Sequence, residues 1–149
     1  MNPVSHEHVN LLLKIYDLRR EEKLRKARQW LASEFQAANL EELGQKYPPG
    51  SEQEPYLRMV ISYWDMVATI VTRGALDEDL FLETTGEHFL VWEKIKHLVP
   101  PIRELYKMPT FCQNLEKLAA RTEEWREKRA PGSTEAFRQM LQQRAKAAR

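Results

Sequence analysis

Histidine and acidic residues are the side chains of this chain that could bind a metal ion or transfer a proton, but their spacing supports neither role. Glu93 and His97 lie four residues apart and share a helical face. No third ligand is near them in the sequence, whereas a catalytic zinc site takes three protein ligands. His6 and His8 are two residues apart, so they point to different faces of a helix. We therefore predict no metal site.

Nucleophile and cofactor motifs are also missing from the sequence. Cys112 is the only cysteine, so the chain can form neither an internal disulfide nor a cysteine zinc site. The sequence has no Gly-rich phosphate loop, no Gly-x-Ser-x-Gly and no Cys-x-x-Cys. We predict no cofactor and no catalytic residue, and we therefore expect that the protein is not an enzyme.

Asp65 and Arg103 are two charged residues that we predict to meet inside the fold. Asp65 lies on a helix with little polar surface, and a buried charge needs a partner of opposite sign. The alternative is that the polar stripe containing Asp65 faces solvent. Together with His88 and Trp92, these residues mark where a pocket would lie if the chain were a small-ligand-binding protein or an enzyme.

A basic run on an early helix is the candidate contact for phosphate groups. It comprises Arg19, Arg20, Lys23, Arg25, Lys26 and Arg28. Such charges bind a nucleic-acid backbone when they lie on one face. Glu21 and Glu22 interrupt the run, and the chain is nearly neutral, with 23 Lys and Arg against 22 Asp and Glu. A solvated, salt-bridged helix face is the simpler interpretation, and nucleic-acid binding is an alternative function.

The N-terminal segment carries more apolar residues than one core contact requires. These residues are Leu11, Leu12, Leu13, Ile15, Tyr16 and Leu18. Apolar surface beyond what the core needs predicts a bound partner, either another protein or a second copy of the chain. Our leading hypothesis is therefore a non-enzymatic helical module for protein–protein interaction or self-association.

The elements that position these residues are all predicted to be helices. The chain has only five glycines and is rich in helix-forming residues. The most informative helix spans about 52–73, begins at a capping sequence near Ser51 and ends at Gly74. It is apolar over most of its circumference, which is typical of a helix at the centre of a bundle. We predict an all-α fold, an irregular bundle of about five to seven helices around this central helix.

Proline and glycine divide the rest of the chain. Pro48-Pro49-Gly50 ends an N-terminal region whose pattern over about 5–36 fits one helix or two. Pro100-Pro101 lies within a periodic apolar run and predicts a kink or a break. We predict one helical domain over 1–130, followed by a basic helix or flexible tail over 131–149.

Length and composition indicate a single folded domain. The chain has 149 residues, 42% apolar and 30% charged, which excludes a disordered chain or a bundle of membrane helices. The N-terminus lacks the basic cluster and apolar core of a signal peptide. Its longest apolar window, 11–18, is far shorter than the roughly 20 residues of a membrane span. We expect no transmembrane segment and a cytoplasmic location.

Residues 20–125 resemble a bacterial family of uncharacterised all-helical domains, many of which carry an N-terminal membrane anchor. The likeness rests, in chain order, on Arg25-Lys26-Ala27-Arg28-Gln29-Trp30, Val71-Thr72-Arg73-Gly74-Ala75-Leu76, Val91-Trp92-Glu93-Lys94 and Ile102-Arg103-Glu104. The resemblance implies an all-α fold and gives no activity or catalytic residue to carry over. No membrane helix precedes Leu24, so we do not expect the anchor here.

Overall fold

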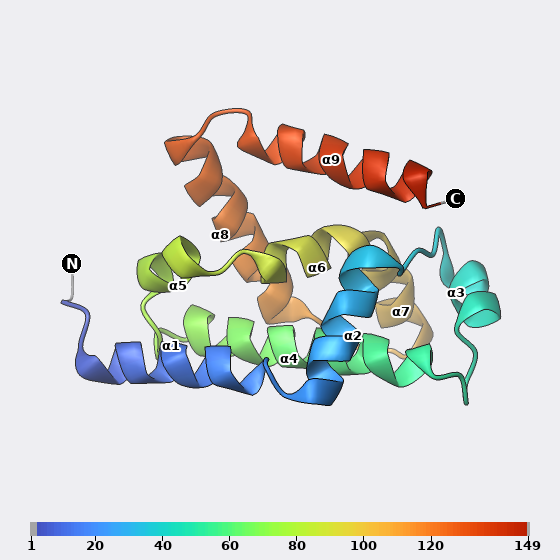
Figure 1. Ribbon diagram of the computed structural model, residues 1–149, viewed down its shortest axis with the longest axis horizontal. Coiled ribbons are helices and arrows are strands. Elements are labelled where there is room, and N and C mark those ends of the chain that lie inside the picture. The colour runs from blue at the N-terminus through green and yellow to red at the C-terminus, as the bar shows by residue number, and fades with distance from the viewer. Residues whose placement is uncertain (1–2, 149) are drawn as a thin grey trace.

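The computed structural model describes residues 3–148, and these form nine α-helices and one 3₁₀-helix without any strand (Figure 1). In chain order the helices are α1 (His6–Leu18), α2 (Glu22–Ser33), α3 (Leu40–Lys46), α4 (Gln53–Thr72), α5 (Glu78–Thr84), α6 (Glu87–Ile95), η1 (Lys96–Leu98), α7 (Val99–Leu105), α8 (Gln113–Arg129) and α9 (Ser133–Ala147). The all-α prediction is confirmed. The helix count exceeds the predicted five to seven because α3, α5 and α7 are separate helices of only seven residues each.

Helix α4 lies at the centre of the bundle, as its apolar circumference predicts. It packs mainly against α2 and α8, and also against α5 and α6. Val60, Trp64 and Val67 on α4 are completely buried. The helix ends where Gly74 adopts a left-handed conformation with φ of +83°, which glycine reaches without steric cost.

The N-terminal region forms two helices rather than one. Helix α1 ends at Leu18, and the Glu21 carboxylate then accepts hydrogen bonds from the backbone N–H groups of Lys23 and Leu24 at 3.0 and 2.9 Å. These two donors have no partner within α2, because the first turn of a helix leaves its N–H groups unpaired. Glu21 therefore starts α2 in a new direction.

The double proline breaks the helical run that contains it. Helix α6 ends at Ile95, η1 follows, and Pro100 and Pro101 occupy the first turn of α7. Proline is tolerated there because the first backbone N–H groups of a helix need no carbonyl partner. The break turns α7 toward α3 and the first half of α4.

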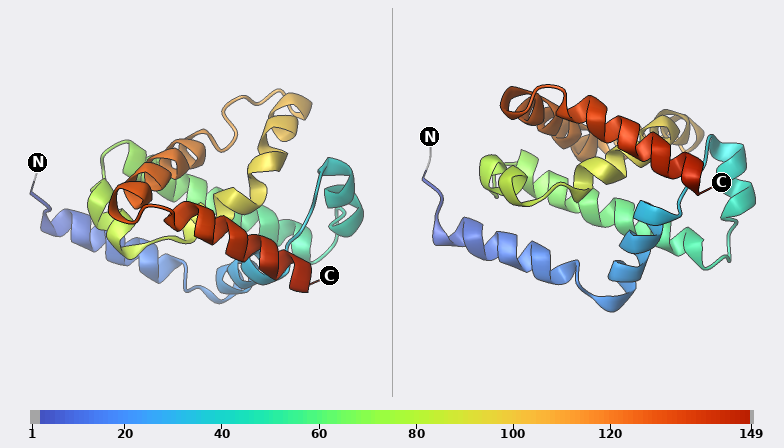
Figure 2. Two further views of the ribbon diagram at one scale, coloured as in Figure 1. Left: turned by 90° about the horizontal axis from the view of Figure 1, so that it is seen from above. Right: turned by 45° about the horizontal axis from the view of Figure 1, so that its top comes forward.

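Helix α9 returns over α6 after the turn at Pro131-Gly132 (Figure 2). The Arg138 guanidinium bridges the carboxylates of Glu93 on α6 and Glu123 on α8, at 2.8 and 3.2 Å. Phe137 packs beside Phe89, with the ring centroids 5.7 Å apart. The segment predicted as a basic helix or a tail is thus a docked helix through Ala147.

Candidate functional site

The first helix presents an apolar stripe to solvent. Val9, Leu13 and Tyr16 are 39%, 59% and 48% exposed and lie at the i, i+4 and i+7 positions of one helical face. Leu18, at the end of the helix, is also exposed. We call Val9, Leu13 and Tyr16 the α1 stripe. Large side chains repeated along one face make a continuous apolar surface rather than isolated exposed residues.

Few contacts attach α1 to the bundle. Ile15 is 4% exposed and enters the core, and its backbone carbonyl accepts a hydrogen bond from the Tyr63 hydroxyl. The imidazole Nδ1 of His8 accepts a hydrogen bond of 2.9 Å from the backbone N–H of Asp77. Leu11 and Leu12 pack partly buried against the core. Three of the six residues predicted as an interface therefore serve the fold, while Leu13, Tyr16 and Leu18 remain outside.

A hollow of about 310 Å³ lies directly beside the α1 stripe. It is lined by Leu12, Leu13, Ile15, Tyr16, Arg19, Trp64, Thr84 and Thr85. Leu13 and Tyr16 thus belong both to the exposed stripe and to the rim of the hollow. The Arg19 guanidinium lies over the Tyr16 ring, 4.6 Å from its centroid, which holds the ring at this rim.

A charged cluster fixes the corner between α1 and α2. The Arg28 guanidinium donates two hydrogen bonds to the Glu87 carboxylate, at 2.7 and 2.9 Å, and a third of 2.9 Å to the backbone carbonyl of Arg19. The indole N–H of Trp64 donates to the same carboxylate at 2.9 Å. A two-pronged contact between arginine and a carboxylate is geometrically specific. This cluster ties α2, α4 and α6 together and orients the end of α1.

The predicted phosphate-binding run is divided by these contacts. Arg28 is paired with the Glu87 carboxylate at 2.7 Å, so its guanidinium already has a partner within the fold. Arg19 and Arg20 both lie over the Tyr16 ring. Lys23, Arg25 and Lys26 stay exposed on α2.

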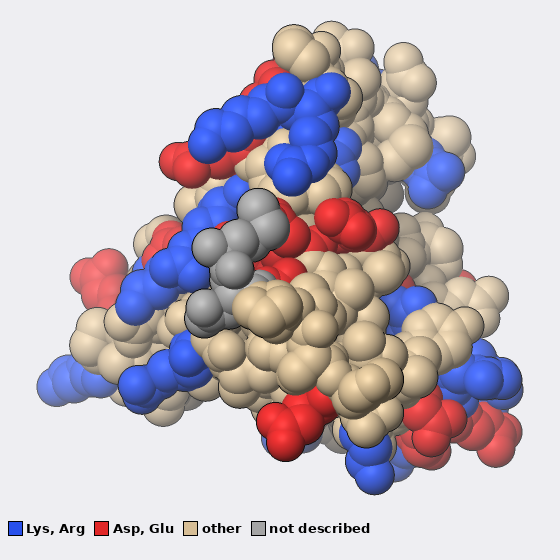
Figure 3. Space-filling model, turned by 90° about the vertical axis from the view of Figure 1, so that its left-hand side faces the viewer, with Lys and Arg blue, Asp and Glu red and all other residues tan. Residues whose placement is uncertain are grey.

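Charge on the side of the molecule near the start of α1 is mixed. In Figure 3, basic and acidic side chains are interspersed around an area of uncharged residues. No single sign of charge dominates this face, in keeping with the near-neutral charge of the whole chain. A nucleic-acid backbone is bound by a surface rich in positive charge.

Asp65 and Arg103 do not form the predicted ion pair. Asp65 Oδ1 accepts a hydrogen bond of 3.0 Å from the backbone N–H of Leu115 in the first turn of α8. Arg103 Nε donates to the Phe111 carbonyl at 2.8 Å, and its Nη2 lies 3.1 Å from the Glu116 carboxylate. An unpaired N–H at a helix start attracts a carboxylate as a guanidinium does. Asp65 and Arg103 therefore each bond to a different nearby group and not to one another.

The four residues of the predicted pocket do not line one hollow. His88 is completely buried, and its Nε2 lies 2.9 Å from the Thr122 hydroxyl. Burial, together with the positive charge of Arg126, lowers the pKa of His88 to about 3, so the ring is neutral at pH 7. Trp92 packs partly buried against the core. Asp65 lines a hollow of about 680 Å³, whereas Arg103 is turned toward α8.

Lys94 has a structural role that the sequence pattern did not reveal. Its ammonium donates to the backbone carbonyls of Leu31 and Ala32, at 2.6 and 3.2 Å, near the end of α2. The last carbonyls of a helix lack partners and favour a positive charge. Burial lowers the pKa of Lys94 to about 8. Sequence alone gave no signal for this contact, because 62 residues separate Lys94 from Ala32.

Among residues 3–148, no group of three or more His, Cys, Asp or Glu side chains is arranged to hold a metal ion. No helix in this part of the chain is both long and apolar enough to cross a membrane.

Comparison with known proteins places the chain in a family. Residues 5–122 match the family model described as a domain of unknown function, DUF4760. The match begins just before α1 and ends within α8, so α1 is part of the shared domain and α9 lies outside it. No curated protein and no solved structure matches the chain. Since the matched region covers well over half of its length, the chain belongs to the DUF4760 family, whose domain has no known function.

Proposed function

We propose that this chain is a non-enzymatic self-association module in which α1 of one copy binds α1 of a second copy. The observation that carries the proposal is the position of the α1 stripe beside the hollow of about 310 Å³. Apolar side chains and a cavity that could receive them share one surface. A surface of this kind is complementary to itself, which is what a two-fold symmetric dimer requires.

The two-fold arrangement follows from the shared rim. With the two α1 helices facing each other, Leu13 and Tyr16 of each copy enter the hollow beside the other copy's α1. Both helices lose their exposed apolar face in the same contact. Helix α1 lies along one edge of the molecule, so no other element stands between it and a second copy (Figure 1).

The dimer we propose is weak. A helix of 13 residues is about 20 Å long. Contact along one such helix buries less than the roughly 800 Å² per partner of a standard interface. We therefore expect a dissociation constant on the order of micromolar or weaker, and an equilibrium that depends on protein concentration.

Analytical ultracentrifugation over about a hundredfold range of concentration tests the proposal. For the wild-type chain we expect the average mass to rise from that of the monomer toward that of the dimer. Leu13→Glu places like charges opposite each other across the two-fold contact, and we expect association to weaken at least about tenfold. Leu105→Glu is the matched control, because Leu105, at 64%, is about as exposed as Leu13, at 59%, and lies at the end of α7, away from α1 (Figure 1).

Two results would overturn the proposal. One is a wild-type chain that stays monomeric at every concentration, and the other is equal association of the Leu13→Glu and Leu105→Glu variants. Recording absorbance at two wavelengths in the same runs shows whether nucleic acid sediments with the protein. Nucleic acid that sediments with the protein and leaves at high salt would favour the alternative function through Lys23, Arg25 and Lys26.

A further inference from the structure

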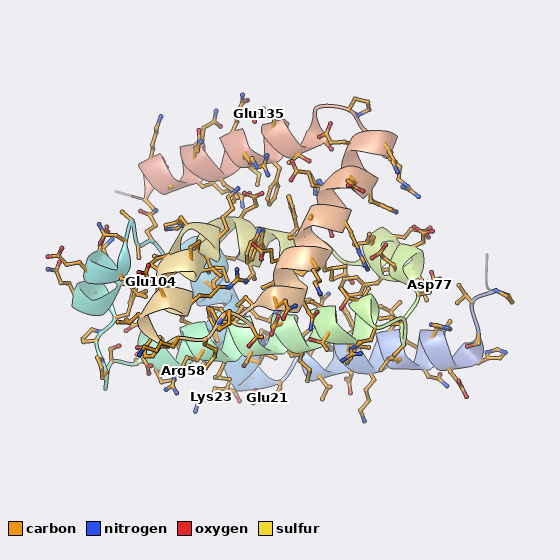
Figure 4. All side chains as sticks on the ribbon, turned by 180° about the vertical axis from the view of Figure 1, so that it is seen from behind. Glu21, Lys23, Arg58, Asp77, Glu104 and Glu135 are labelled. Atoms are coloured by element: carbon orange, nitrogen blue, oxygen red, sulfur yellow. The ribbon has the colours of Figure 1, made fainter. Side chains whose placement is uncertain are left out.

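A second hollow, larger than the one beside α1, lies on another part of the surface. It has a volume of about 680 Å³ and is bounded by α3, the first half of α4, α7 and the loop at 106–112. Figure 4 shows this side of the molecule, with Glu104 on α7 and Arg58 on α4. Its apolar lining includes Leu40, Leu43, Leu57, Ile61, Ile102 and Phe111. We call this hollow the α4 groove.

One wall of the α4 groove is apolar but exposed to solvent. Leu105, the last residue of α7, is 64% exposed, and Tyr106 and Met108, just after the helix, are 68% and 50% exposed. Three large apolar side chains beside an apolar hollow form a contiguous patch, which is uncommon on a protein without a partner. The patch is distinct from the α1 stripe, with which it shares no residue.

The backbone of this wall is held in an unfavourable conformation. Lys107 has φ of +51°, a left-handed value that is uncommon for residues other than glycine. The backbone N–H of Met108 donates to the Arg103 carbonyl at 2.9 Å, and Arg103 Nε donates to the Phe111 carbonyl at 2.8 Å. These bonds fix the loop with Tyr106 and Met108 beside the groove. Strained backbone held by its surroundings is typical of ligand-contacting segments.

The opposite edge of the groove is polar and straight. Glu54, Arg58, Ser62 and Asp65 line it at successive turns of α4, over a length of about 16 Å. Arg58 and Glu54 neutralise each other through a contact of 2.9 Å. Within residues 3–148 the Asp65 carboxylate accepts a hydrogen bond from the backbone N–H of Leu115 and forms no ion pair, so the edge retains one net negative charge.

The shape of the groove favours a helix over a small ligand. A small-molecule site encloses most of its ligand, whereas the wall formed by Leu105, Tyr106 and Met108 leaves the α4 groove open along its side. An amphipathic helix brings its own polar face to cover such an opening. Three turns of a helix match the length of the polar edge. A basic residue on the bound helix would complement the negative charge of Asp65.

We propose that the α4 groove binds an amphipathic helix of another protein. The bound helix carries large apolar residues at i, i+3 or i+4, and i+7, which pack against Leu57, Ile61 and Tyr106. It carries Lys or Arg on the side that faces Asp65. This inference goes beyond self-association through α1 and does not depend on it.

Selection from a random library of displayed peptides tests the inference, with peptides of about 16 residues, or roughly four helical turns. The library is selected on the wild-type chain and counter-selected on the Leu105→Glu variant. We expect the enriched peptides to share helical apolar spacing and an excess of Lys and Arg. The inference is overturned if nothing is enriched over the counter-selection, or if the enriched peptides lack helical spacing.

Affinities of one enriched peptide, made synthetically, locate the site. We expect Leu105→Glu to weaken binding at least about tenfold, as loss of a central apolar contact does. Asp65→Asn keeps an oxygen for the Leu115 N–H but removes the charge, so we expect a loss of roughly threefold that disappears at high salt. Leu13→Glu is the control and leaves the affinity unchanged. Equal binding by the wild-type and Leu105→Glu chains would contradict the inference.

Lauric acid is the probe for the competing occupant. If the groove were built for an acyl chain, lauric acid would bind the wild-type chain at one site and displace the synthetic peptide. That result would overturn the helix assignment. We expect no displacement, and circular dichroism of each variant checks that the substitutions leave the fold intact.

Discussion

Helices α1 and α9 lie at opposite edges of the bundle and differ in how they are attached (Figures 1 and 2). Helix α9 is held by charge, through Arg138 with Glu93 and Glu123, and by the packing of Phe137 on Phe89. None of its large apolar residues is exposed, whereas the α1 stripe faces solvent. A position at the edge of the bundle therefore does not by itself leave large apolar side chains exposed, since α9 covers its own, and the exposed stripe of α1 supports an interface there.

Acid pH is expected to have the largest effect, through the buried His88 on α6. The folded protein protonates His88 only below about pH 3, whereas an unfolded histidine has a pKa of 6.5. Between these values the unfolded state binds more protons, so stability falls as the pH falls, by up to about 1.4 kcal/mol per pH unit. Urea titrations at several pH values measure this slope.

Glu93, which pairs with Arg138 of α9, is a second acid-sensitive group. Burial alone raises the pKa of Glu93, but hydrogen bonds from Arg138 and Lys96 outweigh it and hold the pKa below its usual value of 4.5. Its stabilising contribution is present above pH 4.5 and lost as the pH falls through the lowered value.

The His88→Gln variant is the control for the window between pH 6.5 and 4.5, where its free energy of unfolding should depend less steeply on pH. Identical slopes for the variant and the wild type would rule out His88 as the cause.

Truncating the apolar anchor of α1 is expected to have the next largest effect. Ile15→Ala removes the one α1 side chain that is buried in the core, and we expect a loss of about 3 kcal/mol in the free energy of unfolding. Hydrogen exchange should rise first in α1. Leu13→Ala, at a position 59% exposed, is the control and should change stability by less than about 0.5 kcal/mol. Equal losses for the two variants would mean that α1 is not anchored through Ile15.

Removing the charge that holds α9 is expected to have a smaller effect. Glu93→Gln keeps the shape of a side chain that is only 4% exposed but weakens its bonds to Arg138, and we expect a loss of about 2 kcal/mol. Glu54→Gln, which breaks the exposed pair with Arg58, is the matched control and should cost less than about 0.5 kcal/mol. Urea denaturation measures both values. If the control cost as much as Glu93→Gln, burial of the carboxylate would not explain how α9 is attached.

Sequence reasoning located the helices better than the contacts between them. The central helix was predicted at about 52–73 and is found at Gln53–Thr72, since its apolar pattern and Gly74 are local signals. The N-terminal region could have been one helix or two, because Glu21 starts α2 with a side chain that is an uncommon cap. The prediction that Asp65 pairs with Arg103 was wrong, because each side chain forms a hydrogen bond with a backbone group that no rule of sequence spacing identifies.

By itself, the sequence determined the all-α fold, the central helix and the breaks at Pro48-Pro49-Gly50 and Pro100-Pro101. These depend on backbone preferences and on periodicity, which act over a few residues. Only the tertiary structure decided that Ile15 is buried while Leu13 and Tyr16 are exposed on the same helix. Which side of an apolar helix meets the core depends on helices distant in the sequence, and here Tyr63 and Asp77 hold α1 in that orientation.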